Sequence, residues 1–196
     1  MRIFREQPIG QLFRTTLNNI EREIQGLSEQ KLLNADLETL ATEIATKYKI
    51  NPELSISTEN LSPEVKMEPI PNMRRYFVAT VKYGFPIQGN ADLFKYQPHN
   101  QTHIGDIRGE IINNRFLMIT IWTRWSTPEL NEKTEREVKA QITNQIEDVN
   151  SNIERVKLEA EEFNNSITAP VLASITTRKA EIIEKNKRRD RLNPFN

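Results

Sequence analysis

The stretch Val138–Phe163, VKAQITNQIEDVNSNIERVKLEAEEF, decides the fold of the C-terminal part of this chain. Apolar or small residues recur in it at steps of four, four, three, four, three, four and three, which is the spacing of a coiled-coil seam of about three heptads. The seam consists of Val138, Ile142, Ile146, Val149, Ile153, Val156, Ala160 and Phe163. The sequence therefore predicts a long helix whose seam packs against another helix of the chain or against a partner.

The residues on either side of the seam predict where this helix begins and ends. Thr127-Pro128-Glu129 is a typical helix start, with an N-cap, a proline in the first helical position and an acid in the first turn. Asn164-Asn165-Ser166 is typical of a turn. We therefore expect an antiparallel coiled-coil hairpin over residues 127–192, with an acidic first arm, a basic second arm and a short tail over 193–196.

The residues before the hairpin alternate like β-strands. Tyr76–Tyr83 has two distinct faces, and Gly105–Ile112 and Arg115–Thr123 are joined by Asn113-Asn114, which can supply the positive φ angles of a tight turn. We expect residues 84–97 to form a loop. The second strand of this β-hairpin, Arg115–Thr123, has apolar side chains on both faces, which predicts that both faces of the strand are covered.

The N-terminal part combines helices with a proline-rich segment. Apolar spacings of three and four predict helices within residues 10–48, and Gly26 with Ser28 marks a stop and a restart. Asn34 or Asp36 is a plausible N-cap for the second helix. The fold expected is α+β: residues 1–126 form a domain of N-terminal helices and a small antiparallel β-sheet over 54–123, and the helical hairpin follows.

Composition narrows the class of protein. The chain has no cysteine, which excludes disulfides and thiolate metal sites, and 27 basic residues balance 27 acidic ones. No apolar run approaches the ~18 residues that span a bilayer. We therefore expect a cytoplasmic protein that does not bind a membrane.

No motif indicates a catalytic residue, a cofactor or a metal. Glu64-Val65-Lys66 matches part of a metal-dependent nuclease pattern, with Glu53 as a conceivable partner, but prolines surround both. His99 and His103 are four residues apart, but they lie in a loop rather than on one helical face. We expect both patterns to be ordinary surface features.

The middle block is basic and rich in aromatic residues, which suits base stacking and phosphate neutralisation. The candidate nucleic-acid-binding residues are Arg74, Arg75, Tyr76, Lys82, Lys95, Tyr96, Arg108, Arg115, Arg124 and Trp125. The alternative is that the aromatic side chains belong to the core and the arginines contact acidic helices. Zero net charge favours this alternative.

Three passages together resemble a known group. These are Phe85–Pro98 (FPIQGNADLFKYQP), Gly105–Ile111 (GDIRGEI) and Glu162–Asn164 before a basic helix. The set resembles the N-terminal region of uncharacterised bacterial proteins in which a PD-(D/E)XK nuclease-like domain often follows the helical hairpin. The nuclease segment is absent here, and none of the matched passages is catalytic.

These observations favour a non-catalytic binding or regulatory module. It has long charged helices and no group of residues arranged for catalysis, which predicts that it docks a protein partner. The resemblance implies a bacterial system associated with defence or with a nuclease. A nucleic-acid-binding module that uses the basic aromatic block is the alternative. The seam leaves a homodimer open as well.

Overall fold

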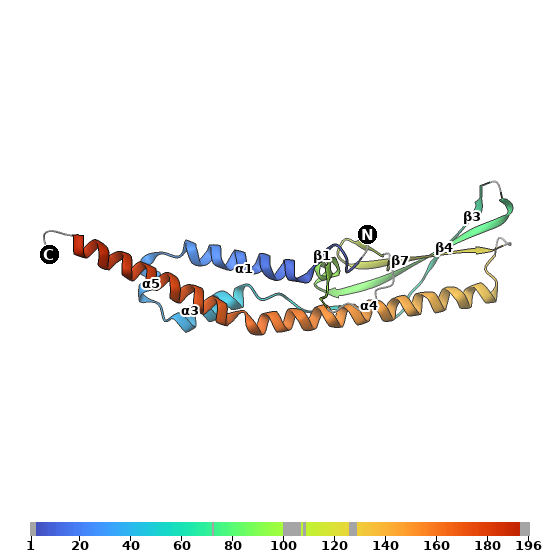
Figure 1. Ribbon diagram of the computed structural model, residues 1–196. Coiled ribbons are helices and arrows are strands. Elements are labelled where there is room, and N and C mark those ends of the chain that lie inside the picture. The colour runs from blue at the N-terminus through green and yellow to red at the C-terminus, as the bar shows by residue number, and fades with distance from the viewer. Residues whose placement is uncertain (1–2, 72, 100–106, 108, 126–128, 193–196) are drawn as a thin grey trace. The chain divides into compact units, whose positions relative to one another are not determined.

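The computed structural model describes residues 3–71, 73–99, 107, 109–125 and 129–192 (Figure 1). The fold is α+β, with N-terminal helices, an antiparallel sheet and a long C-terminal helical region, as the sequence predicts. In chain order the elements are β1 (Gln7–Pro8), α1 (Ile9–Gly26), α2 (Glu29–Asn34), α3 (Leu37–Lys47), β2 (Leu54–Ile56), β3 (Glu64–Ile70), β4 (Met73–Gly89), η1 (Ala91–Lys95), β5 (Tyr96–Gln97), β6 (Gly109–Ile112), β7 (Phe116–Trp125), α4 (Glu132–Ser166) and α5 (Thr168–Leu192).

The chain divides into two compact units. The first, here called the sheet unit, comprises Met1–Ile9 and Asn51–Glu159. The second, the helical unit, comprises Gly10–Ile50 and Ala160–Asn196. The helix α4 contributes residues to both, because the division falls between Glu159 and Ala160.

The sheet unit is built around β4, which pairs with β7 along one edge and with β3 and β2 along the other. Strand β6 adds to the far side of β7. The alternation of β-strands places one set of side chains on the inner face of the sheet, where they are buried. This set is Ala79, Val81 and Phe85 of β4 with Leu117, Ile119 and Ile121 of β7.

The seam of α4 is buried, and in the sheet unit it faces the sheet rather than a second helix. Figure 1 shows α4 running alongside β4 and β7. Ile142 and Ile146 line a pocket together with Phe85 of the inner face. All eight seam residues are at most 9% exposed. A heptad pattern thus marks one apolar stripe, which a β-sheet can cover as well as a helix can.

The structure confirms the predicted tight turn at Asn113-Asn114 and contradicts part of the predicted loop over residues 84–97. Asn113 and Asn114 both have positive φ, at 52° and 57°, between β6 and β7. The loop expected over residues 84–97 is wrong in its first part, because β4 continues to Gly89 and pairs with Phe116 and Leu117 of β7 and then with β2. The alternation of apolar side chains extends through Phe85 and Ile87, and the packing of these side chains favours continuation of the strand.

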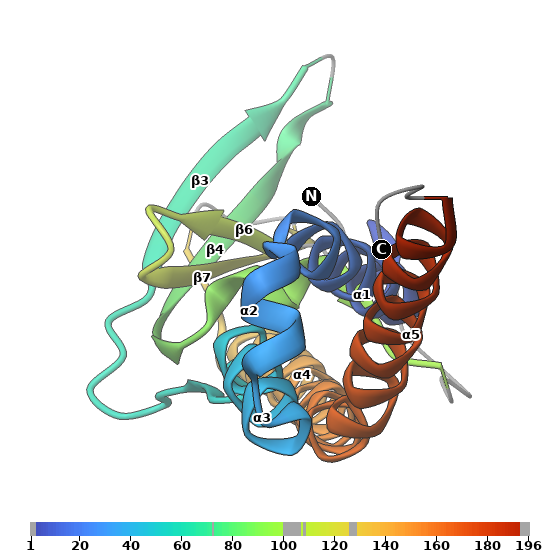
Figure 2. The ribbon, with the colours of Figure 1, turned by 90° about the vertical axis from the view of Figure 1, so that its left-hand side faces the viewer.

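The helical unit has its own core, formed by Ile20, Ile24, Leu32, Leu40, Ala41, Ile44, Ala45, Phe163, Ile167, Val171, Ile175 and Ile182. The rings of Phe13 and Phe163 stack at 4.6 Å between centroids. Figure 2 shows the helices α1, α2, α3 and α5 of this unit. Ser28 and Asp36 are the N-caps of α2 and α3, and their side chains accept from the backbone N–H groups of Lys31 and Thr39. Within the described residues, no helix combines the length and apolarity needed to cross a membrane.

In place of the expected antiparallel arms, α4 and α5 form one long bent helix of 61 residues. Asn164-Asn165-Ser166 stays helical, and the irregularity falls at Ile167, which is buried in the core of the helical unit. Pro170 has no N–H to donate to the carbonyl of Ser166, so the hydrogen-bond ladder is interrupted there. A proline in the first turn of a helix bends the chain without reversing it.

The predicted start of α4 also needs correction. The helix begins at Glu132, and the side chain of Asn131 accepts from the backbone N–H and hydroxyl of Thr134, at 3.0 and 3.1 Å. Thr127 and Pro128 lie outside the described residues. Asn131 thus supplies the N-terminal hydrogen bond expected of Thr127, since an Asn side chain caps a helix as well as a Thr side chain does.

Candidate functional site

The face of the sheet opposite α4, here called the outer face, carries large exposed aromatic side chains. It consists of Tyr76, Val78, Thr80 and Lys82 of β4 with Phe116, Met118, Thr120 and Trp122 of β7. Trp122 is 55% exposed, Tyr76 50% and Phe116 43%. The expectation that both faces are covered is therefore wrong for the described part of the chain.

Strand register makes the outer face continuous. Trp122 lies opposite Thr80, and Phe116 lies opposite Pro86. Side chains directly opposite each other have Cβ atoms only ~5 Å apart, so the exposed rings belong to one surface. Exposed single apolar residues are ordinary, whereas several exposed aromatic side chains along two paired strands make this face a candidate interaction surface.

The charges of the outer-face side chains that the structure describes are close to balanced. Strand β3 adds Glu64 opposite Lys82, and its Lys66 and Glu68 form an ion pair of 2.6 Å. The pair raises the pKa of Lys66 and lowers that of Glu68, since each side chain donates to or accepts from the other. Glu110 of β6 lies opposite Met118. The strands thus add more acids than bases to this face.

The structure does not gather the predicted nucleic-acid-binding residues into one patch. Tyr76 and Lys82 share the outer face, whereas Lys95 pairs with Asp92 at 2.5 Å on η1. In the strand register, Arg124 of β7 lies opposite Val78 of the outer face. The remaining positions are distributed as follows: Tyr96 in β5, Arg115 in the turn before β7, Arg74 and Arg75 in β4, Trp125 in β7, and Arg108 outside the described residues.

A second feature, which the sequence analysis missed, is a cavity of about 240 Å³ on the inner side of the sheet. It is here called the α4–β4 pocket and is lined by Thr58, Leu61, Tyr83, Phe85, Ile142, Thr143, Ile146 and Glu147. The sequence gives little indication of this pocket, because the segment after β2, which contributes Thr58 and Leu61, has no regular spacing of apolar residues. Burial raises the pKa of Tyr83 in this pocket.

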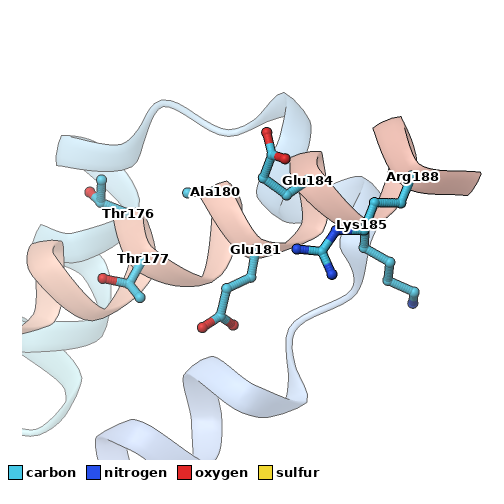
Figure 3. Close-up of a pocket in the computed structure, with 7 residues that line it drawn as sticks. All are labelled: Thr176, Thr177, Ala180, Glu181, Glu184, Lys185 and Arg188. Atoms are coloured by element: carbon cyan, nitrogen blue, oxygen red, sulfur yellow. The ribbon is translucent and has the colours of Figure 1, made fainter. Parts of the chain in front are cut away.

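A larger hollow lies on α5, but it is a surface feature of one helix. Figure 3 shows its lining side chains, all from α5, spread over different sides of that helix. Two of its charged side chains are paired within the helical unit: Lys185 contacts Glu29 at 2.8 Å, and Glu184 contacts Lys187 at 3.0 Å. We therefore assign no ligand to this hollow.

The residues considered for metal chemistry do not converge. Glu53 lies beside Gly89 at one end of β4, while Glu64 lies opposite Lys82, and seven residues of strand separate these positions by roughly 23 Å. His99 is held by Glu159, which accepts from its backbone N–H at 2.8 Å and contacts its ring Nδ1 at 2.6 Å. His103 is outside the described residues, among which no three His, Asp or Glu side chains group to hold a metal ion.

Comparison of the chain with family models, with curated proteins and with solved structures gives no match.

Proposed function

We propose that this chain is a binding module that docks a protein partner through the outer face of its sheet. The observation that supports this most directly is the exposure of Trp122, Tyr76 and Phe116 on one sheet surface. Tryptophan and tyrosine are enriched among the few residues that carry most of the binding energy at protein interfaces, since their side chains bury a large area.

The charge of the outer face favours a protein partner over nucleic acid. A nucleic-acid surface combines aromatic side chains with an excess of cations that neutralise phosphates. Here Lys82 faces Glu64, and Lys66 is paired with Glu68. Among the outer-face side chains that the structure describes, the aromatic rings thus lie beside paired charges and no excess of cations, which suits a protein–protein interface.

The experiment compares proteins retained by the immobilised full chain with those retained by variants. Trp122→Thr combined with Tyr76→Thr removes two aromatic anchors while keeping residues that favour β-strands. The matched control is Leu158→Thr, which removes an equally exposed apolar side chain, 56% against 55%, from α4. A nuclease-like protein is the first partner to test, because of the resemblance described from the sequence.

We expect the partner to bind the unchanged chain and the Leu158→Thr control alike. The double variant should bind about 30-fold more weakly, as for the loss of an aromatic hot spot. Isothermal titration with the purified partner gives these affinities. Equal binding by the double variant, or an equal loss with Leu158→Thr, would contradict docking through the outer face.

A further inference from the structure

The walls of the α4–β4 pocket are apolar and come from three elements. Leu61 belongs to the segment between β2 and β3, Phe85 to β4, and Ile142 with Ile146 to α4. Pockets for drug-sized molecules usually measure ~300–1,000 Å³. A cavity of about 240 Å³ is smaller than these, which suits one long side chain better than a drug-sized molecule.

The polar groups at the pocket point to a cation. Glu147 lines it and has no ion-pair partner within the part of the chain that the structure describes. Its neighbours one helical turn away, Thr143, Asn144, Asn150 and Ser151, are uncharged, so α4 itself offers no counter-ion. The residue next to the lining Thr58 is another acid, Glu59.

Tyr83 adds an aromatic ring to the pocket. Its ring lies stacked 6.2 Å from that of Phe85, and its hydroxyl has no hydrogen-bond partner among the described residues. An aromatic face beside a carboxylate is a favourable place for a cationic head group. Apolar walls, in turn, favour the methylene stem of a long basic side chain.

We propose that the α4–β4 pocket receives a lysine or arginine side chain of a protein partner, with its stem against Leu61, Phe85 and Ile142 and its charge at Glu147. The pocket is on the inner side of the sheet, since Tyr83 and Phe85 alternate with the outer-face residues. The inference therefore does not depend on docking through Trp122 and Tyr76, and either one can fail alone.

The test is a methyl NMR titration of the full chain with two blocked tripeptides, Gly-Lys-Gly and Gly-norleucine-Gly. They share the same stem length and differ in the charge. We expect the lysine peptide to shift the methyl signals of Leu61, Ile142 and Ile146 and to bind about threefold more tightly than the norleucine peptide. Raising NaCl from about 50 to about 500 mM should reduce this preference, because salt screens the charge at Glu147.

Two variants decide whether the pocket is responsible. Glu147→Gln should abolish the preference for lysine, whereas the exposed Glu154→Gln on the same helix should keep it. Thr143→Trp, at an exposed lining position, should block the pocket and remove binding of both peptides. Equal binding of the two peptides by the unchanged chain, an unaltered preference in Glu147→Gln, or no methyl shift at all would overturn the inference.

Discussion

At the residue scale, the side chain of Glu23 joins two helices of the helical unit. Its carboxylate accepts from Lys47 Nζ at 2.6 Å and from the Tyr48 hydroxyl at 2.7 Å, joining α1 to the end of α3. Both bonds favour the ionised form and lower the pKa of Glu23 below its usual 4.5, Lys47 having the larger effect. A carboxylate with a lowered pKa stabilises the fold above its unfolded pKa, and this contribution is lost as the pH falls through the folded pKa.

We therefore expect Glu23→Gln to lower the free energy of unfolding by about 1 kcal/mol near neutral pH and by less in acid. Urea denaturation at a series of pH values from about 7 to about 3 measures the difference. Glu43→Gln, at an exposed position of α3, is the control and should change little at any pH. A cost for Glu23→Gln that is the same at every pH would show that ionisation of Glu23 does not contribute.

At the element scale, Asn164 of the predicted turn lies within α4 and bonds to a distant part of the chain. Its amide oxygen accepts from the backbone N–H of Ile50 at 2.8 Å, and its Nδ2 donates to the Ile50 carbonyl at 2.7 Å. Asn164→Ala leaves both partly buried backbone groups without this partner, so we expect a loss of about 1–3 kcal/mol in unfolding free energy. The neighbouring Asn165→Ala, at an exposed position, should cost less than about 0.5 kcal/mol.

This residue also shows what sequence patterns leave out. Asparagine is common in turns because its side chain can bond to nearby backbone, but Asn164 bonds to backbone 114 residues away in the chain. The caps at Ser28 and Asp36 were predictable since their partners are local. Likewise, alternation predicted the strands around Asn113-Asn114, whereas the exposure of Trp122 depends on what packs over the sheet, which no local pattern encodes.

The seam of α4 gives a second prediction at this scale. Ile153 is 2% exposed, and its burial is what the heptad spacing correctly anticipated. Ile153→Ala should cost about 2–5 kcal/mol through lost apolar contact and a residual cavity. Leu158→Ala, on the exposed side of the same helix, should change stability by less than about 0.5 kcal/mol. Similar costs for both variants in denaturant titration would mean that the seam is not a packed core.

At the scale of the whole molecule, part of the basic charge of α5 is used in contacts within the helical unit. Arg178 of α5 donates to the Leu27 carbonyl at 2.9 Å, and Lys179 lies 3.4 Å from the Ala35 carbonyl. These carbonyls follow the last residues of α1 and α2, where cations oppose the helix dipole. Part of the basic charge of α5 thus stabilises the helical unit and is not free to form a patch for phosphates.

This distribution predicts how the purified chain behaves toward nucleic acid. Affinity for phosphates comes from uncompensated cations, and each neutralised phosphate steepens the dependence on salt. With 27 basic and 27 acidic residues, and with Lys66 paired on the sheet, we expect a protein-like ratio of absorbance at 260 and 280 nm after purification at low salt. We also expect no mobility shift of a single-stranded DNA of about 30 nucleotides at physiological salt. A shift that is abolished by salt and by Lys82→Glu, but unaffected by Lys133→Glu on α4, would instead favour nucleic-acid binding through the outer face.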